Sequence, residues 1–410
     1  MNPTLTPAAA AGSRLHAFDT LRAAALLAGL ALHGALSYLP GAERYWIVAD
    51  APSRALALLF YLVHCCRMPV FFLLAGFFAA AGVARLGAVA FARDRLRRIV
   101  LPLLMFWPLV MTGIVAVVVA AVALKNGGSL PAESPPGPRL TPDDFPLTHL
   151  WFLYVLALFY AAALVWRALL ARLDPADRVG SAARAVLDRL LRPGAISALG
   201  LPLAACLART PDWLPWFGVP TPDQSLYPNL AATVGFGLAF AVGWQLQRSA
   251  ASLLPRLARD WPRHLLVGIA AAAFCLYLAG PLPTLAKADA SPVWPLYAIA
   301  YAAAGWSLCL AAAGAALRHA DAFDARRRYL ADASYWIYLL HLPLLMALQV
   351  AAAQLAWPWW IEYPLSLALC LAVLLAAYAL FVRDGWLGAL LNGRRRPRHA
   401  GTGAAAVVTP

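Results

Sequence analysis

The chain has 410 residues, of which 62% are hydrophobic and only 13% are charged. A soluble globular domain is about 45–50% apolar and about 25% charged, so this composition excludes an ordinary cytosolic enzyme, a disordered protein and a nucleic-acid-binding protein. The formal net charge of +14 therefore has to be interpreted against a membrane topology. The six cysteines show neither metal-ligand spacing nor a disulfide framework, so we predict no metal site. We also predict no bound cofactor.

Ten apolar segments alternate with polar ones along the chain. A membrane-spanning helix needs about 20 mostly apolar residues, and the fifth segment is short and contains Pro202. The sequence predicts an all-α integral membrane protein with about ten transmembrane helices in contact with the lipid bilayer. The predicted spans cover 19–39, 56–80, 99–123, 149–171, 195–208, 229–247, 264–280, 295–317, 331–353 and 361–382.

Basic residues are distributed unevenly between the two sides that ten spans define. If the N-terminus is cytoplasmic, 26 of the 33 lysine and arginine residues fall in cytoplasmic segments and six in external ones. Cytoplasmic loops carry the excess of Lys and Arg, so we predict that both termini are cytoplasmic. The predicted organisation is a cytoplasmic segment 1–18, a membrane domain 19–385 and a basic, disordered cytoplasmic tail 386–410.

The first span combines a possible ion pair with a histidine. Asp19 and Arg22 are three residues apart and can pair on one helix face. His33 lies about 20° from the face of Arg22 and ~16 Å further along the helix axis. Because ionisable groups inside a membrane are functional candidates, we interpret this face as an anion receptor with an acid–base group above it. Alternatively, Arg22 is a topological anchor and His33 only joins two helices.

Three further arginines are candidates. Arg67 lies near the middle of the second span, where few acidic residues lie at matching depth. Because an arginine is always charged, Arg67 needs a partner, which is either a substrate or a structural ion pair. Arg95 and Arg98 share a face at the start of the third helix and could hold phosphate groups through forked donors. Alternatively, Arg95 and Arg98 only belong to the excess of basic residues on the cytoplasmic side and bind no ligand.

Two later spans carry polar residues that could line the same cavity. His149 and Trp151 open the fourth span near its external interface, where Trp usually belongs to the aromatic belt. Ser334, Tyr338 and His341 form one polar stripe at i, i+4 and i+7 of the ninth span. Such a stripe either contacts a substrate or joins helices at roughly 0.6 kcal/mol per hydrogen bond.

Five motifs in this chain resemble the membrane acyltransferase-3 family, in order from about residue 14 to residue 385. They are FDTLRAAALLAGLALH, HCCRMPVFFLLAGFF, RDRLRRIVLP, THLWFLYVLALFY and ASYWIYLLHLPL. The second and fourth are most similar to the branch of glucans biosynthesis protein C, which succinylates periplasmic glucans. Arg22 and His33 match the family's first-span pattern, and Arg95 and Arg98 match its Arg-x-x-Arg pattern. Ala75 departs from the family, which often has Ser there.

The resemblance implies a bacterial inner-membrane enzyme that moves a succinyl or acetyl group from cytoplasmic acyl-CoA to a hydroxyl of a glycan, such as a periplasmic glucan. Acyl-CoA would be a co-substrate. Its phosphates would bind Arg22, Arg95 and Arg98, with Asp19 beside Arg22. His33 would act as general base or be acylated transiently. Arg67 would hold a succinyl carboxylate or stabilise the thioester oxyanion.

A transporter or flippase of a glycan or lipid-linked substrate is the alternative, because ten spans with polar linings fit it equally well. Such a protein typically shows an inverted repeat between its halves, and none is visible between spans 1–5 and 6–10. A sensor or scaffold would leave the spacing of Arg22 and His33 unexplained. The acyl group, the acceptor and the oligomeric state stay open at this stage.

Overall fold

The protein is helical throughout the part that its computed structural model describes, which comprises residues 16–130, 140–192 and 194–393. No strand occurs in these ranges. Nine of the helices described there are long and apolar enough to cross a membrane, which confirms the prediction of an all-α, multi-pass membrane protein. The predicted terminal segments 1–18 and 386–410 lie outside these ranges, except for 16–18 and 386–393.

The nine spanning helices include two that contain a π-helical turn. They are α1 (His16–Ala35), α2 (Arg54–Leu86), α3 (Ala88–Arg95) continuing through η3 (Leu96–Val100) into α4 (Leu101–Lys125), α5 (Trp151–Leu173), α8 (Leu230–Arg248), α9 (Ala250–Ala279), α10 (Val293–His319), α11 (Ala325–Ala352), and α12 (Trp359–Ala377) continuing into η6 (Tyr378–Val382). The short helices are η1 (Leu36–Tyr38), η2 (Ala42–Arg44), η4 (Thr148–Leu150), α6 (Arg178–Leu190), α7 (Ser197–Leu207), η5 (Pro215–Phe217) and α13 (Trp386–Asn392).

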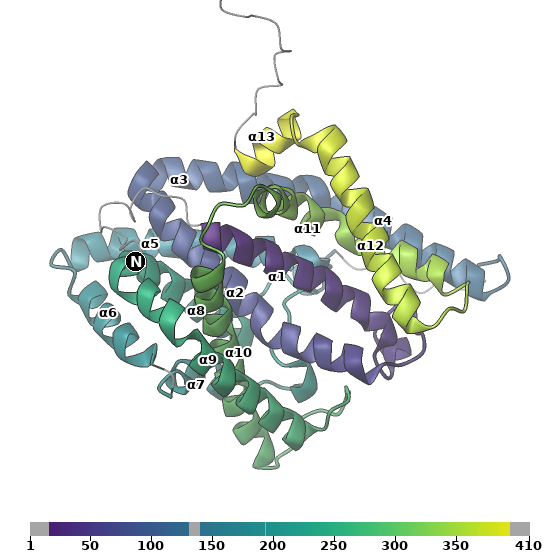
Figure 1. The fold of residues 1–410 in the computed structure, drawn as a ribbon, viewed down its shortest axis with the longest axis horizontal. Helices are drawn as coiled ribbons and strands as arrows, with labels where there is room; N and C mark the ends of the chain where they lie inside the picture. Colours follow the sequence, from purple (N-terminus) through teal and green to yellow (C-terminus); the bar gives the residue numbers. More distant parts are fainter. Residues whose placement is uncertain (1–15, 131–139, 193, 394–410) are drawn as a thin grey trace, which may run out of the picture.

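Helix α1 runs through the middle of the bundle, packed against α2, α10, α11 and α12 (Figure 1). Two hydrogen bonds fix its direction relative to α11. Arg22, near the start of α1, donates to the carbonyl of Ala331, and the carbonyl of Gly34, near its end, accepts from Gln349. Residue numbers therefore rise together along α1 and α11, and the two helices are parallel.

The predicted fifth span, 195–208, forms a short helix that is not among the nine spanning helices. With both termini cytoplasmic, this helix and the chain after it have to make the fifth crossing together. Helix α7 has 11 residues and is ~16 Å long, whereas the hydrocarbon core is about 30 Å thick. Pro211 follows it, and the chain continues without a further helix to Trp213, whose carbonyl accepts a hydrogen bond from Ala288 in the α9–α10 connection. Trp213 is buried. Protein thus shields this irregular backbone, as a membrane interior requires.

Two short α-helices, α6 and α13, occur outside the predicted spans. Helix α6 is tied to α8 by Asp177, which forms ion pairs with Arg248 at 2.7 Å and Arg184 at 2.9 Å. Hydrogen bonds from Arg248 and Arg184 lower the pKa of the Asp177 carboxyl. Helix α13 occupies the start of the tail predicted as disordered, and Leu391 is buried there. The apolar residues of this segment therefore fold back onto the bundle.

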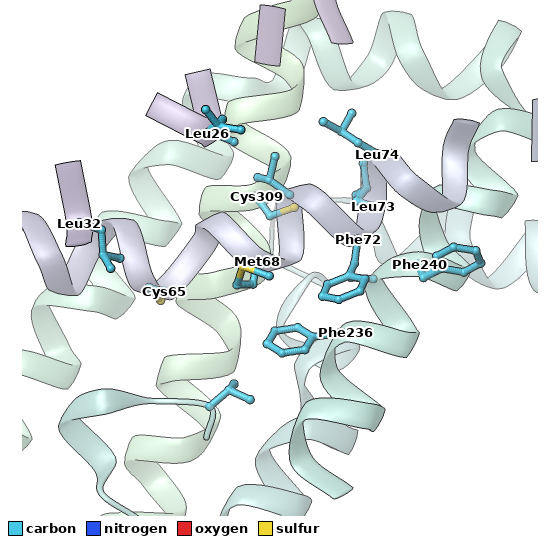
Figure 2. Packing of buried hydrophobic residues seen from close by; sticks show 14 of the residues in the cluster. Leu26, Leu32, Cys65, Met68, Phe72, Leu73, Leu74, Phe236, Phe240 and Cys309 are labelled. Atoms are coloured by element: carbon cyan, nitrogen blue, oxygen red, sulfur yellow. The ribbon is translucent and has the colours of Figure 1, made fainter. Parts of the chain in front are cut away.

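Helices α2 and α8 approach each other closely at a glycine. Gly243 of α8 faces the backbone of Leu73, and a Cβ at this position would lie 2.7 Å from the carbonyl carbon of Leu73. Beside this contact Phe72 of α2 stacks on Phe236 of α8, with 5.0 Å between the ring centroids; Figure 2 shows the two rings face to face. Small residues let membrane helices gain van der Waals contact, so this contact positions α2 and its Arg67.

The close approach at Gly243 predicts a loss of stability when this glycine is changed. Gly243→Ala should lower the thermal unfolding midpoint in detergent, because relieving such a collision typically costs about 1–3 kcal/mol. Gly237→Ala on the same helix is the matched control. Its Cβ would meet Phe159 at an ordinary 3.5 Å, so its midpoint should stay the same or rise. Equal midpoints for the two variants would contradict the role of this contact.

The orientation of the bundle is a prediction that a reporter can test. With cytoplasmic termini, a topology reporter inserted after Gly128, between α4 and η4, should lie outside the cytoplasm. The same reporter inserted after Pro175, between α5 and α6, should be cytoplasmic. Accessibility to a membrane-impermeant thiol reagent at single introduced cysteines provides an independent measurement. Both reporters on one side, or the reverse result, would contradict the predicted topology.

Candidate active site

A single cavity of about 2250 Å³ follows α1 through the bundle. All of the residues that the sequence singled out line it, although they come from separate helices. The residues are Asp19, Arg22, His33, Arg67, Arg95, Arg98, His149, Trp151, Ser334, Tyr338 and His341.

The two ends of this cavity have different linings. Where α1 begins, at what we call the arginine end, the lining includes Arg22, Arg85, Arg95, Arg98, Arg328 and Arg383. Where α1 stops, at what we call the loop end, the lining includes Tyr45, Trp46, Thr210, Asp212, Asp223 and Gln224. One continuous space therefore connects a cationic end to an aromatic and polar end, and it passes His33 on the way.

Arg22 contacts a backbone carbonyl and a carboxylate at the arginine end. Its Nη2 donates to the carbonyl of Ala331 at 3.1 Å and lies 3.5 Å from a carboxylate oxygen of Asp19. The spacing of three residues thus places both side chains on one face of α1, as predicted. The Arg22 side chain is still 38% exposed, so part of its guanidinium faces the cavity.

Arg95 and Arg98 meet on one carboxylate. Both guanidinium groups pair with Asp94, the Nε of Arg98 at 2.9 Å. The π-helical turn η3 begins directly after Arg95, and such turns are frequent at functional sites. Arg93 and Arg97 in the same segment are exposed and do not line the cavity. The fold thus separates two cavity-facing arginines from two outward-facing ones.

His33 is hydrogen-bonded to a second histidine at the centre of the cavity. Its Nδ1 lies 2.8 Å from Nε2 of His341 on α11. The Nδ1 of His341 lies 2.8 Å from the carbonyl oxygen of Tyr338. Because a carbonyl oxygen only accepts, His341 Nδ1 must carry a proton. A neutral His341 then has an unprotonated Nε2, which accepts the Nδ1 proton of His33.

This assignment, made from the hydrogen-bond partners, leaves Nε2 of His33 with a free lone pair. No group of the described residues is hydrogen-bonded to that nitrogen. His33 lines the cavity, so the lone pair is available to a bound molecule. A neutral imidazole with an accessible lone pair is the form that accepts a proton in general-base catalysis.

Arg67 lies beside His33 with no carboxylate to pair with. A Cβ at Gly29, one turn before His33 on α1, would collide with the Arg67 guanidinium. The Nε of Arg67 is buried without a hydrogen-bond partner, and no ion pair of Arg67 occurs within the described ranges. A cation at this depth is costly, so a bound anion or water in the cavity has to stabilise it.

His149 and Trp151 lie in the protein interior, not in an aromatic belt at the membrane surface. Trp151 is only 5% exposed and stacks on Phe236 at 5.6 Å. His149 is 8% exposed, and its Nε2 lies 3.1 Å from the carbonyl oxygen of Tyr338. The Tyr338 hydroxyl in turn donates to the carbonyl of His149 at 2.7 Å. The start of α5 is covered by α2, α8 and α11, so Trp151 lines the cavity, as one of the two interpretations expected, and does not belong to an aromatic belt.

Ser334 has a local role on α11. Its hydroxyl donates to the carbonyl of Ala331 at 2.8 Å, the same carbonyl that Arg22 contacts. Ser334, Tyr338 and His341, predicted to form one stripe of α11, therefore all line the same cavity. Each member of this stripe joins α11 to itself or to a neighbouring helix while lining the cavity.

Several cavity residues were missed from the sequence. His64 on α2 lies three residues before Arg67, stacks on Phe60 at 5.4 Å and lines the cavity. Its place beside Arg67 in the second span was a usable signal. Arg328 pairs with Asp332 at 3.0 Å. It lies in a basic cluster of the kind expected in any cytoplasmic loop, so the sequence did not single it out. Within the described residues, no group of three His, Cys, Asp or Glu side chains could hold a metal ion.

Comparison with known proteins gives one match. A model of the acyltransferase-3 family, described as an acyltransferase domain, matches residues 15–380. No curated protein and no solved structure matches the chain. The matched range contains every residue that lines the centre of the cavity, including His33, Arg67 and His341.

Proposed function

Because this chain belongs to the acyltransferase-3 family and is therefore a membrane acyltransferase, we propose that it acylates a glycan hydroxyl from a cytoplasmic acyl-CoA. The acyl group is succinyl or acetyl, and the acceptor is a glycan such as a periplasmic glucan. In this proposal the protein lies in the bacterial inner membrane with both termini, and the arginine end, in the cytoplasm. Acyl-CoA and the acceptor meet inside the cavity.

The observation that carries the proposal is the cavity that connects two chemically different ends past His33. The arginine end suits a polyanion such as the phosphate-rich head group of CoA, because Arg guanidinium groups bind phosphate through paired donors. Arg22, Arg95 and Arg98 would hold those phosphates. The distance of ~16 Å from Arg22 to His33 along α1 would be covered by the extended arm that ends in the thioester.

The loop end suits a polyhydroxyl acceptor. Trp46 donates its indole N–H to Gln349 at 3.1 Å, and Tyr45 donates its hydroxyl to the carbonyl of Pro40 at 3.1 Å. With their polar ends occupied, these rings offer apolar faces on which a sugar ring can pack. Asp212 and Asp223 line the same end and supply acceptors for sugar hydroxyl groups.

His33 would act as general base in the transfer step. Its Nε2 takes the proton of the acceptor hydroxyl while the oxygen attacks the thioester carbonyl carbon. The tetrahedral intermediate collapses, the C–S bond breaks, and the CoA thiolate leaves with the proton that His33 gives back. In the variant with an acyl-histidine, Nε2 itself attacks the thioester and the acceptor then displaces His33.

Arg67 has two roles consistent with its position. Its guanidinium, adjacent to the turn of α1 below His33, would stabilise the negative oxygen of the tetrahedral intermediate, since charge stabilisation of this kind is strongest in a site that excludes water. With a succinyl donor it would instead bind the free carboxylate. The two roles are separated by measuring the rates of acetyl transfer and succinyl transfer in an Arg67→Lys variant. Stabilisation of the intermediate predicts that both rates fall, whereas binding of the succinyl carboxylate predicts that only succinyl transfer changes.

The second candidate function is a transporter or flippase of a glycan or lipid-linked substrate. The continuous cavity between the two ends favours it, because a transport path also needs to reach both sides. Mass spectrometry of cell-envelope glycans separates the two functions, since only an acyltransferase adds the mass of an acyl group.

His33→Ala should abolish acylation while donor binding stays nearly intact. General-base catalysis typically contributes 10²–10⁴-fold, and the loss should be at least of that order. The measurement is the mass shift of envelope glycans, together with acyl transfer by purified protein normalised to the folded fraction. His319→Ala, at the end of α10 and outside the cavity lining, is the matched control. Normal specific activity of His33→Ala would refute the assignment.

Arg95→Ala combined with Arg98→Ala should weaken acyl-CoA binding to the detergent-solubilised protein. Losing a charge-assisted contact to phosphate should cost on the order of 1.5–3 kcal/mol. Arg93→Ala with Arg97→Ala removes the same charge from the same segment but leaves the cavity lining unchanged. Isothermal titration with CoA should therefore show weaker binding only for the first pair. Equal losses would mean that these arginines act only through overall charge.

A further inference from the structure

Helix α11 has a carbonyl, that of Leu339, which receives no N–H from the residue four positions later. Pro343 lies inside α11 and has no backbone N–H, so it cannot donate to the carbonyl of Leu339, four residues earlier. A carbonyl left without a donor in a membrane interior costs several kcal/mol. Another group therefore has to donate to it.

His149 is placed to make that donation from outside the helix. Its Nε2 lies 3.3 Å from the carbonyl oxygen of Leu339 and 3.1 Å from that of Tyr338. Both partners are acceptors, so Nε2 carries the proton, and Nδ1 of His149 is buried without a partner. The hydroxyl of Tyr338 donates back to the carbonyl of His149. These contacts clamp the start of α5 onto the α11 turn that precedes His341.

The clamp acts on the same carbonyl that orients His341. The carbonyl oxygen of Tyr338 accepts from His149 Nε2 and also from His341 Nδ1, at 2.8 Å. The latter bond fixes which nitrogen of His341 accepts from His33. The protonation pattern of His33 thus depends, through two hydrogen bonds, on the position of one backbone carbonyl.

We propose that His341 and His149 are positioning residues: His149 replaces the donor that Pro343 lacks, and His341 holds His33 in the tautomer whose Nε2 is the free base. The proposal rests on the proposed function for its effect on transfer, while the tautomer itself is a property of the protein alone. A merely structural role would predict lower stability of the variants with unchanged activity per folded molecule.

The first experiment replaces the acceptor at position 341. In His341→Leu nothing accepts the Nδ1 proton of His33, so kcat should fall on the order of 10²-fold or more while KM for the donor changes little. In His341→Gln the amide oxygen can accept that proton, so this variant should regain most of kcat. A loss of equal size in both variants, or a change in KM alone, would overturn the role of His341.

The second experiment uses Pro343 to rescue His149. His149→Phe should lower kcat because the Leu339 carbonyl loses its donor and the turn shifts. Adding Pro343→Ala restores a backbone N–H at position 343, so the double variant should be more active than His149→Phe alone. Pro343→Ala by itself is the control. A double variant no better than His149→Phe would show that His149 does not act through this carbonyl.

The closing experiment reads the tautomer directly and needs no turnover. In protein labelled with ¹⁵N-histidine, the ring nitrogens of His33, identified by their loss in His33→Gln, should show a protonated Nδ1 and an unprotonated Nε2. In His341→Leu this pattern should change, and in His341→Gln it should persist. The same tautomer in all three proteins would overturn the proposal. The expected tautomers in a protein without acyl-transfer activity would instead refute the proposed function.

Discussion

The hydrogen bond between His33 and His341 joins two parallel helices from opposite ends of the sequence, and the centre of the molecule is organised around it. On either side of it, Arg22 reaches the carbonyl of Ala331 and Gln349 reaches that of Gly34. These three contacts fix the depth of α1 against α11. In a membrane such bonds contribute modestly to stability, about 0.6 kcal/mol each, so their main effect is to set register and ring orientation.

An uncompensated cation next to this pair gives the cavity its chemical character. Arg67 is close to the backbone of α1 at Gly29, and within the described residues no carboxylate pairs with it. An arginine at the centre of a helix costs about 2.5–3.5 kcal/mol on insertion scales. Such a cost is tolerated where water or a bound anion reaches the charge. The cavity therefore lets water or an anion reach the buried Arg67 side chain, and Arg67 in turn gives the cavity a site that attracts anions.

The asymmetry of the two ends fits a reaction with two unlike substrates. Arginines gather at one end, while aromatic rings and short polar side chains line the other. His33 stands between them with its lone pair unoccupied by protein. The glycine contact of α2 with α8 and the clamp of His149 on α11 hold the helices that carry Arg67 and His341. Packing outside the cavity thus determines the geometry inside it.

The sequence by itself determined the membrane class, the positions of nine spanning helices and a set of candidate polar residues, which the structure then placed in one cavity. The physical reason is that apolar length and intramembrane charge are local properties, and the three-residue spacing of Asp19 and Arg22 is a local rule of helix geometry. The spacing of Arg22 and His33 followed from the same rule.

Only the tertiary structure decided the rest. It showed that the irregular chain after α7 is shielded at Trp213 and that Trp151 is buried, because both depend on which segments cover them. It also paired His33 with His341 across 308 residues of chain and placed His149 against the carbonyl that Pro343 leaves free. The tautomer of a histidine depends on the hydrogen-bond partners of its ring nitrogens. Here these partners come from helices that are distant in the sequence, so no local sequence pattern predicts them.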